Sequence, residues 1–518
     1  MGLELLKDRL AKLWQLPLLL LSLALFGYAA YLFIDPQAGP SAAQQIEIAR
    51  VLLKQDRAEA AIKHLNTLLE KGNLKPEVEG GIRVVLGEAL EQAQKQKGLN
   101  LAVNHVQIIE QTKRGISMGI VADAPVHRRL GESYEALGRA RDAVAHYQKA
   151  AGLDSAHGQK WQRKVIDLEL SQEDYDAATT SIDEYLKRSD LADGERAWAM
   201  GEKAHILIDR GQFQEAKRIL ADALRLSEKE GGNPGVFGYW LGYSEWKLGN
   251  VAEAERLMRA ARDVLRVQHP LDGDAAYSLG RLKQEQKEYA VANSYYAAVL
   301  QSHLDSRVAP SAKLNRGICR IALGEHEPGL SDLSDLTRLV KEKQLLPPRL
   351  RGEVIAGLQE AMQLLSAQGN YQGALEVLAY EQELQSEPGA DFFERLGRLY
   401  ERRAAQLEGG IGEVMAQDKA RREQQARECR AKAGDAYTAV ARLLVVQDDK
   451  GHGEALWKAV EQYERSADLS RVTAALETFV GERPDDSRAP DALLKLGQSY
   501  QAAGLFDKAI EAYRRNQF

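Results

Sequence analysis

A short pattern of small residues recurs along most of this chain at nearly constant spacing, and it limits the possible fold more than any other feature. The segments LGESYEALGRARDAVAHY (residues 130–147) and LGQSYQAAGLFDKAIEAY (residues 496–513) carry Leu, Gly, Tyr, Gly, Ala and Tyr at the same positions. The small residue in the second half of the pattern recurs at Ala61, Ala143, Ala178, Ala216, Ala254, Ala292, Gly329, Ala374 and Ala509, with Ala475 as a weaker member. Internal periods of 20–50 residues are typical of stacked supersecondary units.

Each copy of the pattern predicts two antiparallel helices joined by a tight turn. A glycine, which takes the left-handed conformation that ends a helix, recurs five residues before the small residue: Gly138, Gly211, Gly249, Gly324, Gly369 and Gly504. A second small residue recurs twelve residues before it: Gly131, Ala204, Gly242, Gly280, Gly317 and Gly497. Two small residues on facing helices let the backbones approach closely. Residues that favour helices dominate the composition, so we expect an all-α chain.

This pattern resembles the tetratricopeptide repeat family, most closely over residues 124–157 and 483–518 and also across residues 159–381. The resemblance implies a right-handed α-solenoid of antiparallel helix hairpins, in which the first helix of each hairpin lines a concave groove that binds other proteins or peptides. The sequence departs from the family in two ways. The closing proline is mostly absent, and the commonest spacing is 38 residues, not the 34 of the family.

The apolar run at residues 13–34 contains no charged residue and predicts a transmembrane helix, since it would span about 33 Å against a hydrocarbon core of about 30 Å. Lys7, Arg9 and Lys12 precede the run and Asp35 follows it, which predicts a cytoplasmic N-terminus. We therefore expect a single-pass signal anchor in contact with lipid, with the solenoid outside the cytoplasm and in the periplasm of a Gram-negative cell. A signal peptide cleaved after the small residues at 41–43, or a buried core helix, are the alternatives.

The remaining chain divides by how regularly the pattern recurs. We expect a basic N-terminus at residues 1–12, a linker at 35–43, atypical helical repeats at 44–122, a solenoid at 123–385, an extended helical hairpin inserted at 386–450, and further repeats at 451–518. The last unit stops before its second helix would finish and no capping helix follows. This predicts that the natural protein continues or that the chain is a fragment.

Motifs for catalysis, metal binding and cofactor binding are absent from the sequence. It lacks HExxH, GxxxxGK[ST], GxSxG and the Rossmann fingerprint, and its two cysteines fit no zinc spacing. The net charge of −6 with mixed signs argues against a general nucleic-acid binder. We therefore expect no enzyme, no cofactor, no metal, no nucleic acid and no small-molecule substrate.

Two sets of residues fall where the family resemblance places the groove. Tyr239, Tyr243 and Trp246 share one face of a helix and are candidate anchors for a peptide, although they could equally pack between repeats. A basic stretch that could face an acidic partner, or form a solvated surface, consists of Arg128, Lys160, Arg163 and Lys164. The family's carboxylate-clamp pattern is not reproduced here.

These observations support two hypotheses about function. The first is a membrane-anchored scaffold for protein–protein interactions. Residues 483–518 resemble the repeats of periplasmic proteins that coordinate envelope constriction or outer-membrane assembly, which implies a role in envelope biogenesis or export. The alternative is a regulatory or substrate-positioning arm of an enzyme whose catalytic domain lies beyond residue 518.

Overall fold

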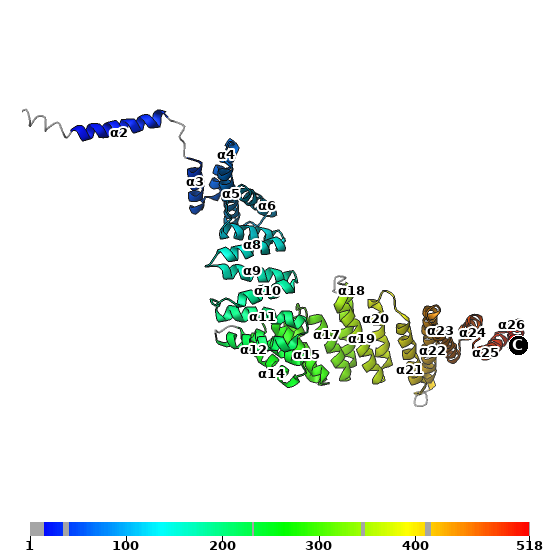
Figure 1. Cartoon of the computed structure of the whole chain (residues 1–518). Helices are drawn as coiled ribbons and strands as arrows, with labels where there is room; N and C mark the ends of the chain where they lie inside the picture. Colours follow the sequence, from blue (N-terminus) through cyan, green and yellow to red (C-terminus); the bar gives the residue numbers. More distant parts are fainter. Residues whose placement is uncertain (1–14, 35–40, 230–232, 343–347, 410–415, 517–518) are drawn as a thin grey trace, which may run out of the picture. The chain divides into compact units, whose positions relative to one another are not determined.

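The protein is built of helices. The computed structural model describes residues 15–34, 41–229, 233–342, 348–409 and 416–516, and these ranges contain 25 helices and no strand (Figure 1). The predicted all-α class is therefore confirmed. The chain divides into two compact units, Met1–Arg210 and Gly211–Phe518, each with its own internal contacts. The predicted N-terminal segment at residues 1–12 and most of the linker predicted at 35–43 lie outside the described residues.

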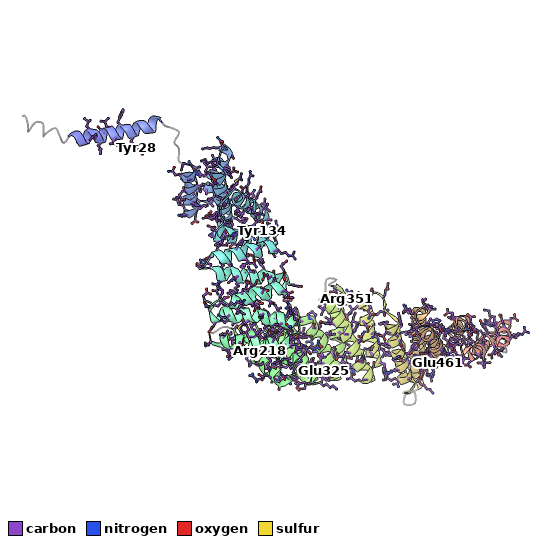
Figure 2. All side chains as sticks on the ribbon, in the orientation of Figure 1. Tyr28, Tyr134, Arg218, Glu325, Arg351 and Glu461 are labelled. Atoms are coloured by element: carbon purple, nitrogen blue, oxygen red, sulfur yellow. The ribbon has the colours of Figure 1, made fainter. Side chains whose placement is uncertain are left out.

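From α3 onward, the first unit is a series of helices in which chain neighbours pack against each other. Its helices are α2 (Gln15–Ile34), α3 (Ala42–Lys54), α4 (Ala58–Lys71), α5 (Pro76–Gln96), α6 (Ala102–Ser117), α7 (Ala124–Ala136), α8 (Ala140–Leu153), α9 (Gly158–Ser171), α10 (Tyr175–Leu186) and α11 (Asp193–Asp209). Tyr134 of α7, which is labelled in Figure 2, is buried in a cluster with Leu130 and Tyr147. Large side chains of this kind fill the space between the helices of a pair.

The second unit repeats the same arrangement over a longer stretch of chain. Its helices are α12 (Phe213–Lys229), α13 (Pro234–Lys247), α14 (Val251–Leu265), α15 (Pro270–Glu285), α16 (Tyr289–Ser302), α17 (Ala309–Ala322), α18 (His326–Glu342), α19 (Pro348–Ala367), α20 (Tyr371–Leu384), α21 (Ala390–Gly409), α22 (Ala416–Leu444), α23 (Asp449–Ser466), α24 (Leu469–Glu482), α25 (Ala489–Ala502) and α26 (Phe506–Arg515). First helices also touch one another, since α17 packs against both α15 and α19. Within this unit the hairpins are therefore stacked, as the repeat predicts.

In ten of the hairpins one residue with a positive φ angle marks the turn, and the second helix begins two residues later. All six predicted glycines take this conformation. In four hairpins a residue with a side chain takes it instead: Asp56, Glu173, Lys287 and Ala467. In the hairpin whose turn is at Ala467, the residue five positions after the turn is Val472 and not Ala475. Val472 is 7% exposed, whereas Ala475 is only partly buried. The turn sets the register of the repeat more reliably than the small side chain does.

Close contact between the paired helices depends on the second small position. A Cβ atom added to Gly131 would lie 2.8 Å from the ring of Tyr147, and one added to Gly280 would lie 2.6 Å from the ring of Tyr296. These distances are shorter than any normal carbon–carbon contact, so the glycines are required where the rings pack. The long helices use the same device, because a Cβ on Gly397 of α21 would lie 2.9 Å from the ring of Tyr437 on α22.

The prediction of a single-pass membrane protein is wrong. Among the described parts of the chain, the structure contains no helix with the length and apolar character needed to cross a bilayer. The predicted transmembrane helix was the basis for three other predictions: a lipid contact, a cytoplasmic N-terminus and a solenoid outside the cytoplasm. These predictions are therefore not supported either.

Candidate functional site

Helix α13 carries the predicted aromatic face, and the structure divides its residues into a buried part and a half-exposed part. Tyr239 is 3% exposed, and its hydroxyl lies 3.3 Å from Oγ of Ser278 on α15. Burial raises the pKa of Tyr239 above its ordinary value, although the hydrogen bond with Ser278 opposes this shift. Tyr239 therefore packs between two first helices, which is the structural alternative to a role in binding.

Three other rings of α13 remain half-exposed, and we call them the α13 aromatic surface: Trp240, Tyr243 and Trp246. The Tyr243 ring lies 5.8 Å from each of the two indole rings, in edge-to-face geometry. The Trp246 Nε1–H donates a hydrogen bond of 2.9 Å to Oε2 of Glu285 on α15. The ammonium of Lys247 lies 4.1 Å from the centre of the Trp246 ring. These contacts hold the rings in fixed positions with part of their surface open.

Glycines explain why this helix can present so many rings. A Cβ on Gly235 would lie 2.8 Å from Leu265, and one on Gly242 would lie 2.9 Å from Met258. This strip of glycines lets α14 pack tightly, while the neighbouring strip of α13 carries the rings. Sequence analysis identified Tyr243 and Trp246 but missed Trp240, because Trp240 lies outside the i, i+4, i+7 pattern.

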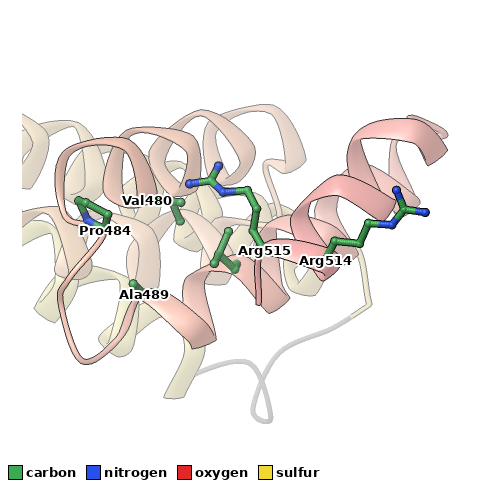
Figure 3. A pocket seen from close by; sticks show the side chains of 6 residues that line it. Val480, Pro484, Ala489, Arg514 and Arg515 are labelled. Atoms are coloured by element: carbon green, nitrogen blue, oxygen red, sulfur yellow. The ribbon is translucent and has the colours of Figure 1, made fainter. Parts of the chain in front are cut away.

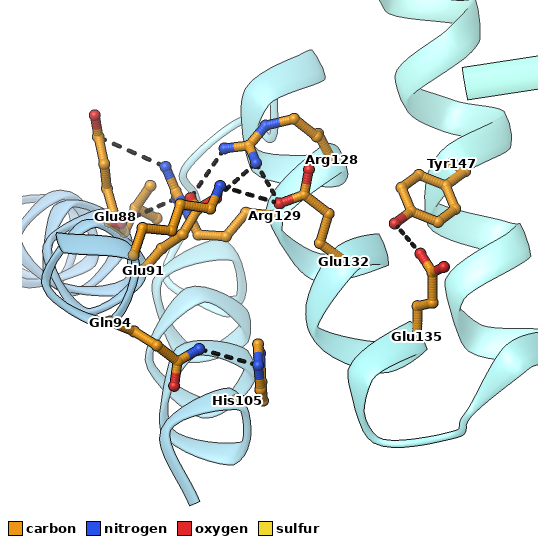
Figure 4. A network of polar contacts seen from close by, with 11 residues as sticks. Glu88, Glu91, Gln94, His105, Arg128, Arg129, Glu132, Glu135 and Tyr147 are labelled. Atoms are coloured by element: carbon orange, nitrogen blue, oxygen red, sulfur yellow. Dashed lines mark hydrogen bonds and ion pairs between the residues drawn. The ribbon is translucent and has the colours of Figure 1, made fainter. Parts of the chain in front are cut away.

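The predicted basic residue Arg128 belongs to an ion-pair network between α5 and α7 (Figure 4). Its guanidinium donates hydrogen bonds of 2.6 and 2.9 Å to the two carboxylate oxygens of Glu91 and one of 2.6 Å to Glu132. The buried Arg129 donates a further bond of 2.9 Å to Glu91. Burial by itself would raise the pKa of Glu91, but the hydrogen bonds from Arg128 and the neighbouring cations hold that pKa far below its usual range.

Two further ion pairs connect α9 with α7 and with α11. Lys164 Nζ lies 2.6 Å from Oε1 of Glu135, whose other oxygen accepts a 2.7 Å hydrogen bond from the Tyr147 hydroxyl. Arg163 donates a 2.5 Å hydrogen bond to Glu195 at the start of α11 and lies 4.1 Å from the centre of the Trp198 ring. We call these pairs the charge ladder of α5, α7, α9 and α11.

The ladder pairs the predicted cations with acids one hairpin away. Lys160 instead lies against an aromatic ring of its own helix, with its ammonium 4.9 Å from the centre of the Trp161 ring. The acidic partners could have been found from the sequence, because Glu91 and Arg128 are separated by 37 residues, close to one repeat. A groove that attracts an acidic partner stays a prediction, but internal pairing reduces the positive charge that these side chains offer.

The second unit also carries a pocket of about 380 Å³ between α24, α25 and α26 (Figure 3). It is lined by Val480, Pro484, Ala489, Leu493, Arg514 and Arg515. Its floor is apolar and its rim carries two exposed arginines.

Reactive or metal-binding groups are not gathered anywhere in the described ranges. No cluster of three or more His, Cys, Asp or Glu side chains that could hold a metal occurs in them. Cys319 and Cys429 are free and buried. Burial raises the pKa of the Cys319 thiol to about 12, which opposes the thiolate form that a nucleophile needs.

Comparison with known families agrees with the hairpin geometry. Tetratricopeptide-repeat family models match residues 125–157, 196–230, 239–282 and 491–515. The chain contains tetratricopeptide repeats. Such repeats are typical non-catalytic scaffolds for protein–protein interactions. The matches at residues 125–157 and 491–515 fall in the two segments whose sequence resembles the family most closely.

Solved structures with a similar arrangement are distant in sequence. The apo form of RapI is 13% identical with a TM-score of 0.44, and the match covers 66% of this chain and 97% of that one. A Rap protein complexed with competence and sporulation factor is 14% identical with a TM-score of 0.34, and the match covers 68% and 99%. A tetratricopeptide repeat protein from Parabacteroides merdae ATCC 43184 is 13% identical with a TM-score of 0.33, and the match covers 60% and 99%. These similarities carry no argument about function. A search of curated proteins finds no match.

Proposed function

We propose that this protein is a scaffold that binds a segment of a partner protein on the α13 aromatic surface. One observation carries the proposal. Trp240, Tyr243 and Trp246 are half-exposed on the first helix of a hairpin that a tetratricopeptide-repeat model matches over residues 239–282. Trp and Tyr are enriched at the hot spots of protein interfaces, so three neighbouring rings that keep part of their surface open favour a binding role.

The chemistry of the surface describes the segment that fits it. The rings offer apolar area for one or two apolar side chains of the partner, while Lys247 and Glu285 place one charge of each sign at the edge. Because the rings are already fixed by their neighbours, the partner loses little free energy in ordering them. We therefore expect an apolar anchor flanked by polar residues, in an extended or helical segment.

Photo-crosslinking tests this proposal at a single residue. A benzophenone amino acid replaces Trp246 in one variant and Arg256 in a control variant, since Arg256 is exposed on α14 of the same hairpin. In cells that produce the full chain, the Trp246 variant should form a discrete crosslinked protein that the Arg256 variant lacks. The same adduct from both variants, or none from the Trp246 variant, would contradict the proposal.

A pair of substitutions then measures the contribution of the rings. Tyr243→Ala with Trp246→Ala should weaken binding of the crosslinked partner by about 2–4 kcal/mol, the range found for aromatic hot spots. Arg256→Ala should change it by less than about 0.5 kcal/mol. A role in envelope biogenesis or export rests only on the resemblance of residues 483–518 and stays a prediction.

A further inference from the structure

Two hairpins of the second unit have the same internal spacing, so their residues can be compared position by position. The turn residues Lys287 and Gly324 are 37 residues apart, and so are Ala467 and Gly504. The first helix between each pair of turns begins at an Ala-Pro step, Ala309 in α17 and Ala489 in α25. The two segments therefore superpose in register without a gap.

An ion pair in the earlier hairpin has no counterpart in the later one. Lys313 Nζ lies 2.9 Å from Oδ2 of Asp335, and this pair links α17 to α18. The aligned residues in the later hairpin are Leu493 of α25 and Arg515 of α26. Leucine at this position offers no charge to residue 515, and both Leu493 and Arg515 line the pocket of about 380 Å³.

The pocket combines an apolar floor with positive charge at its rim. Val480, Ala489 and Leu493 are all buried beneath the opening. The side chain of Arg515 reaches toward Val480, whereas Arg514 extends the other way from the same last turn of α26 (Figure 3). Among the residues that the structure describes, neither arginine forms an ion pair, although the aligned Asp335 does.

We propose that this pocket binds a segment of a partner protein in which a carboxylate lies next to an apolar side chain. The apolar side chain enters the pocket against Val480 and Leu493, and the carboxylate pairs with Arg515, which can donate two parallel hydrogen bonds to it. Arg514 adds attraction over a longer distance. The proposal goes beyond the proposed function, since it uses α24, α25 and α26 and does not involve α13.

The carboxylate can come from a chain terminus or from an aspartate or glutamate side chain. Three fluorescein-labelled octapeptides that differ only at the end distinguish these sources: one ends in Asp-Leu with a free carboxylate, one ends in the same residues with a terminal amide, and one ends in Asn-Leu with a terminal amide. Fluorescence anisotropy with the full chain measures the affinity of each. Binding of the first alone identifies a terminal carboxylate, and binding of the first two identifies a side-chain carboxylate.

Variants that recreate the internal ion pair provide the main control. Leu493→Lys with Arg515→Asp restores the pairing found between α17 and α18, so it should keep the fold and lower peptide affinity at least about tenfold. Arg515→Gln alone should lower it about three- to tenfold. Arg218→Ala, an exposed arginine on α12, should change it less than twofold.

The outcome that overturns the proposal is specific. Equal affinity for the Asn-Leu amide, no binding of any peptide, or unchanged affinity in both Arg515 variants would each show that the pocket does not recognise a carboxylate. Tyr243→Ala with Trp246→Ala should leave peptide affinity unchanged, so failure here and failure of the α13 surface are separate results.

Discussion

Gly280→Ala tests whether close packing of small residues against rings holds the hairpins together. The added Cβ would lie 2.6, 2.9 and 3.0 Å from three atoms of the Tyr296 ring, which is completely buried. The ring is also fixed by its hydroxyl, which donates a 2.8 Å hydrogen bond to Gln284. Overpacking of this kind destabilises a fold by about 1–3 kcal/mol, whereas the higher helix propensity of alanine relative to glycine stabilises it by up to about 1 kcal/mol. We expect a net loss of about 1–2 kcal/mol.

Gly352→Ala is the matched control, because Gly352 lies inside α19 of the same unit with no atom within 4 Å of the added Cβ. It should stabilise its helix by about 0.5–1 kcal/mol, so the two substitutions have opposite signs. Stacked repeats unfold locally, so hydrogen exchange of α15 and α16 in one case and of α19 and α20 in the other is the suitable measurement. If Gly280→Ala slows exchange in α15 and α16, the reasoning about close packing is refuted.

Three further predictions concern the turns, the charge ladder and the thiols. Gly249→Ala should cost about 1–2 kcal/mol, because φ is 84° there, and faster exchange in α13 and α14 would show it. Because the pKa of Glu91 is lowered on folding, its stabilising effect is present above the unfolded pKa and is lost on acidification through the folded value. Exchange protection of α5 and α7 should therefore fall less with acid in Glu91→Gln than in the unaltered chain, and an equal fall would contradict this. Cys319, with its raised pKa, should react with iodoacetamide at pH 8 much more slowly than a free peptide thiol, and rapid labelling by mass spectrometry would count against its burial.

The sequence predicts the hairpins well because their determinants are local. A glycine that ends a helix or admits a ring is visible as a residue type, and every predicted turn glycine has a positive φ. At Asp56, Glu173 and Lys287 the residue type does not mark the turn, because a left-handed residue with a side chain costs only about 1–2 kcal/mol and the rest of the hairpin imposes it. The small residues of the pattern alone indicate these three hairpins. The turn at Ala467 is equally hard to recognise. The sequence pattern therefore points to Ala475, whereas Val472 is the residue that follows the turn by five positions.

The predicted site was harder to judge, because burial and pairing depend on the neighbouring hairpins. Tyr239 and Tyr243 are one helical turn apart on α13, yet only Tyr239 is buried, since Ser278 of α15 lies against it. Arg163 and Lys164 look like free cations in the sequence, but their partners come from α11 and α7. Helix periodicity predicts which face of its own helix a residue lies on. It does not predict which side chains of the neighbouring helix contact that residue.

The two first-helix surfaces differ in what they can offer a partner. In the charge ladder, Arg128 and Lys164 are already paired within the chain, so an acidic partner must replace bonds that exist. The Lys164–Glu135 pair is partly exposed, where an ion pair is worth only about 0.2–1 kcal/mol and exchanging one for another gains almost nothing. The Arg128–Glu91 pair is more buried, so breaking it costs more. Trp246 is partly exposed with Lys247 over part of its ring, and covering the remaining apolar area would contribute about 25 cal/mol per Å². Binding free energy should therefore concentrate on α13, while the ladder mainly holds successive hairpins of the first unit together.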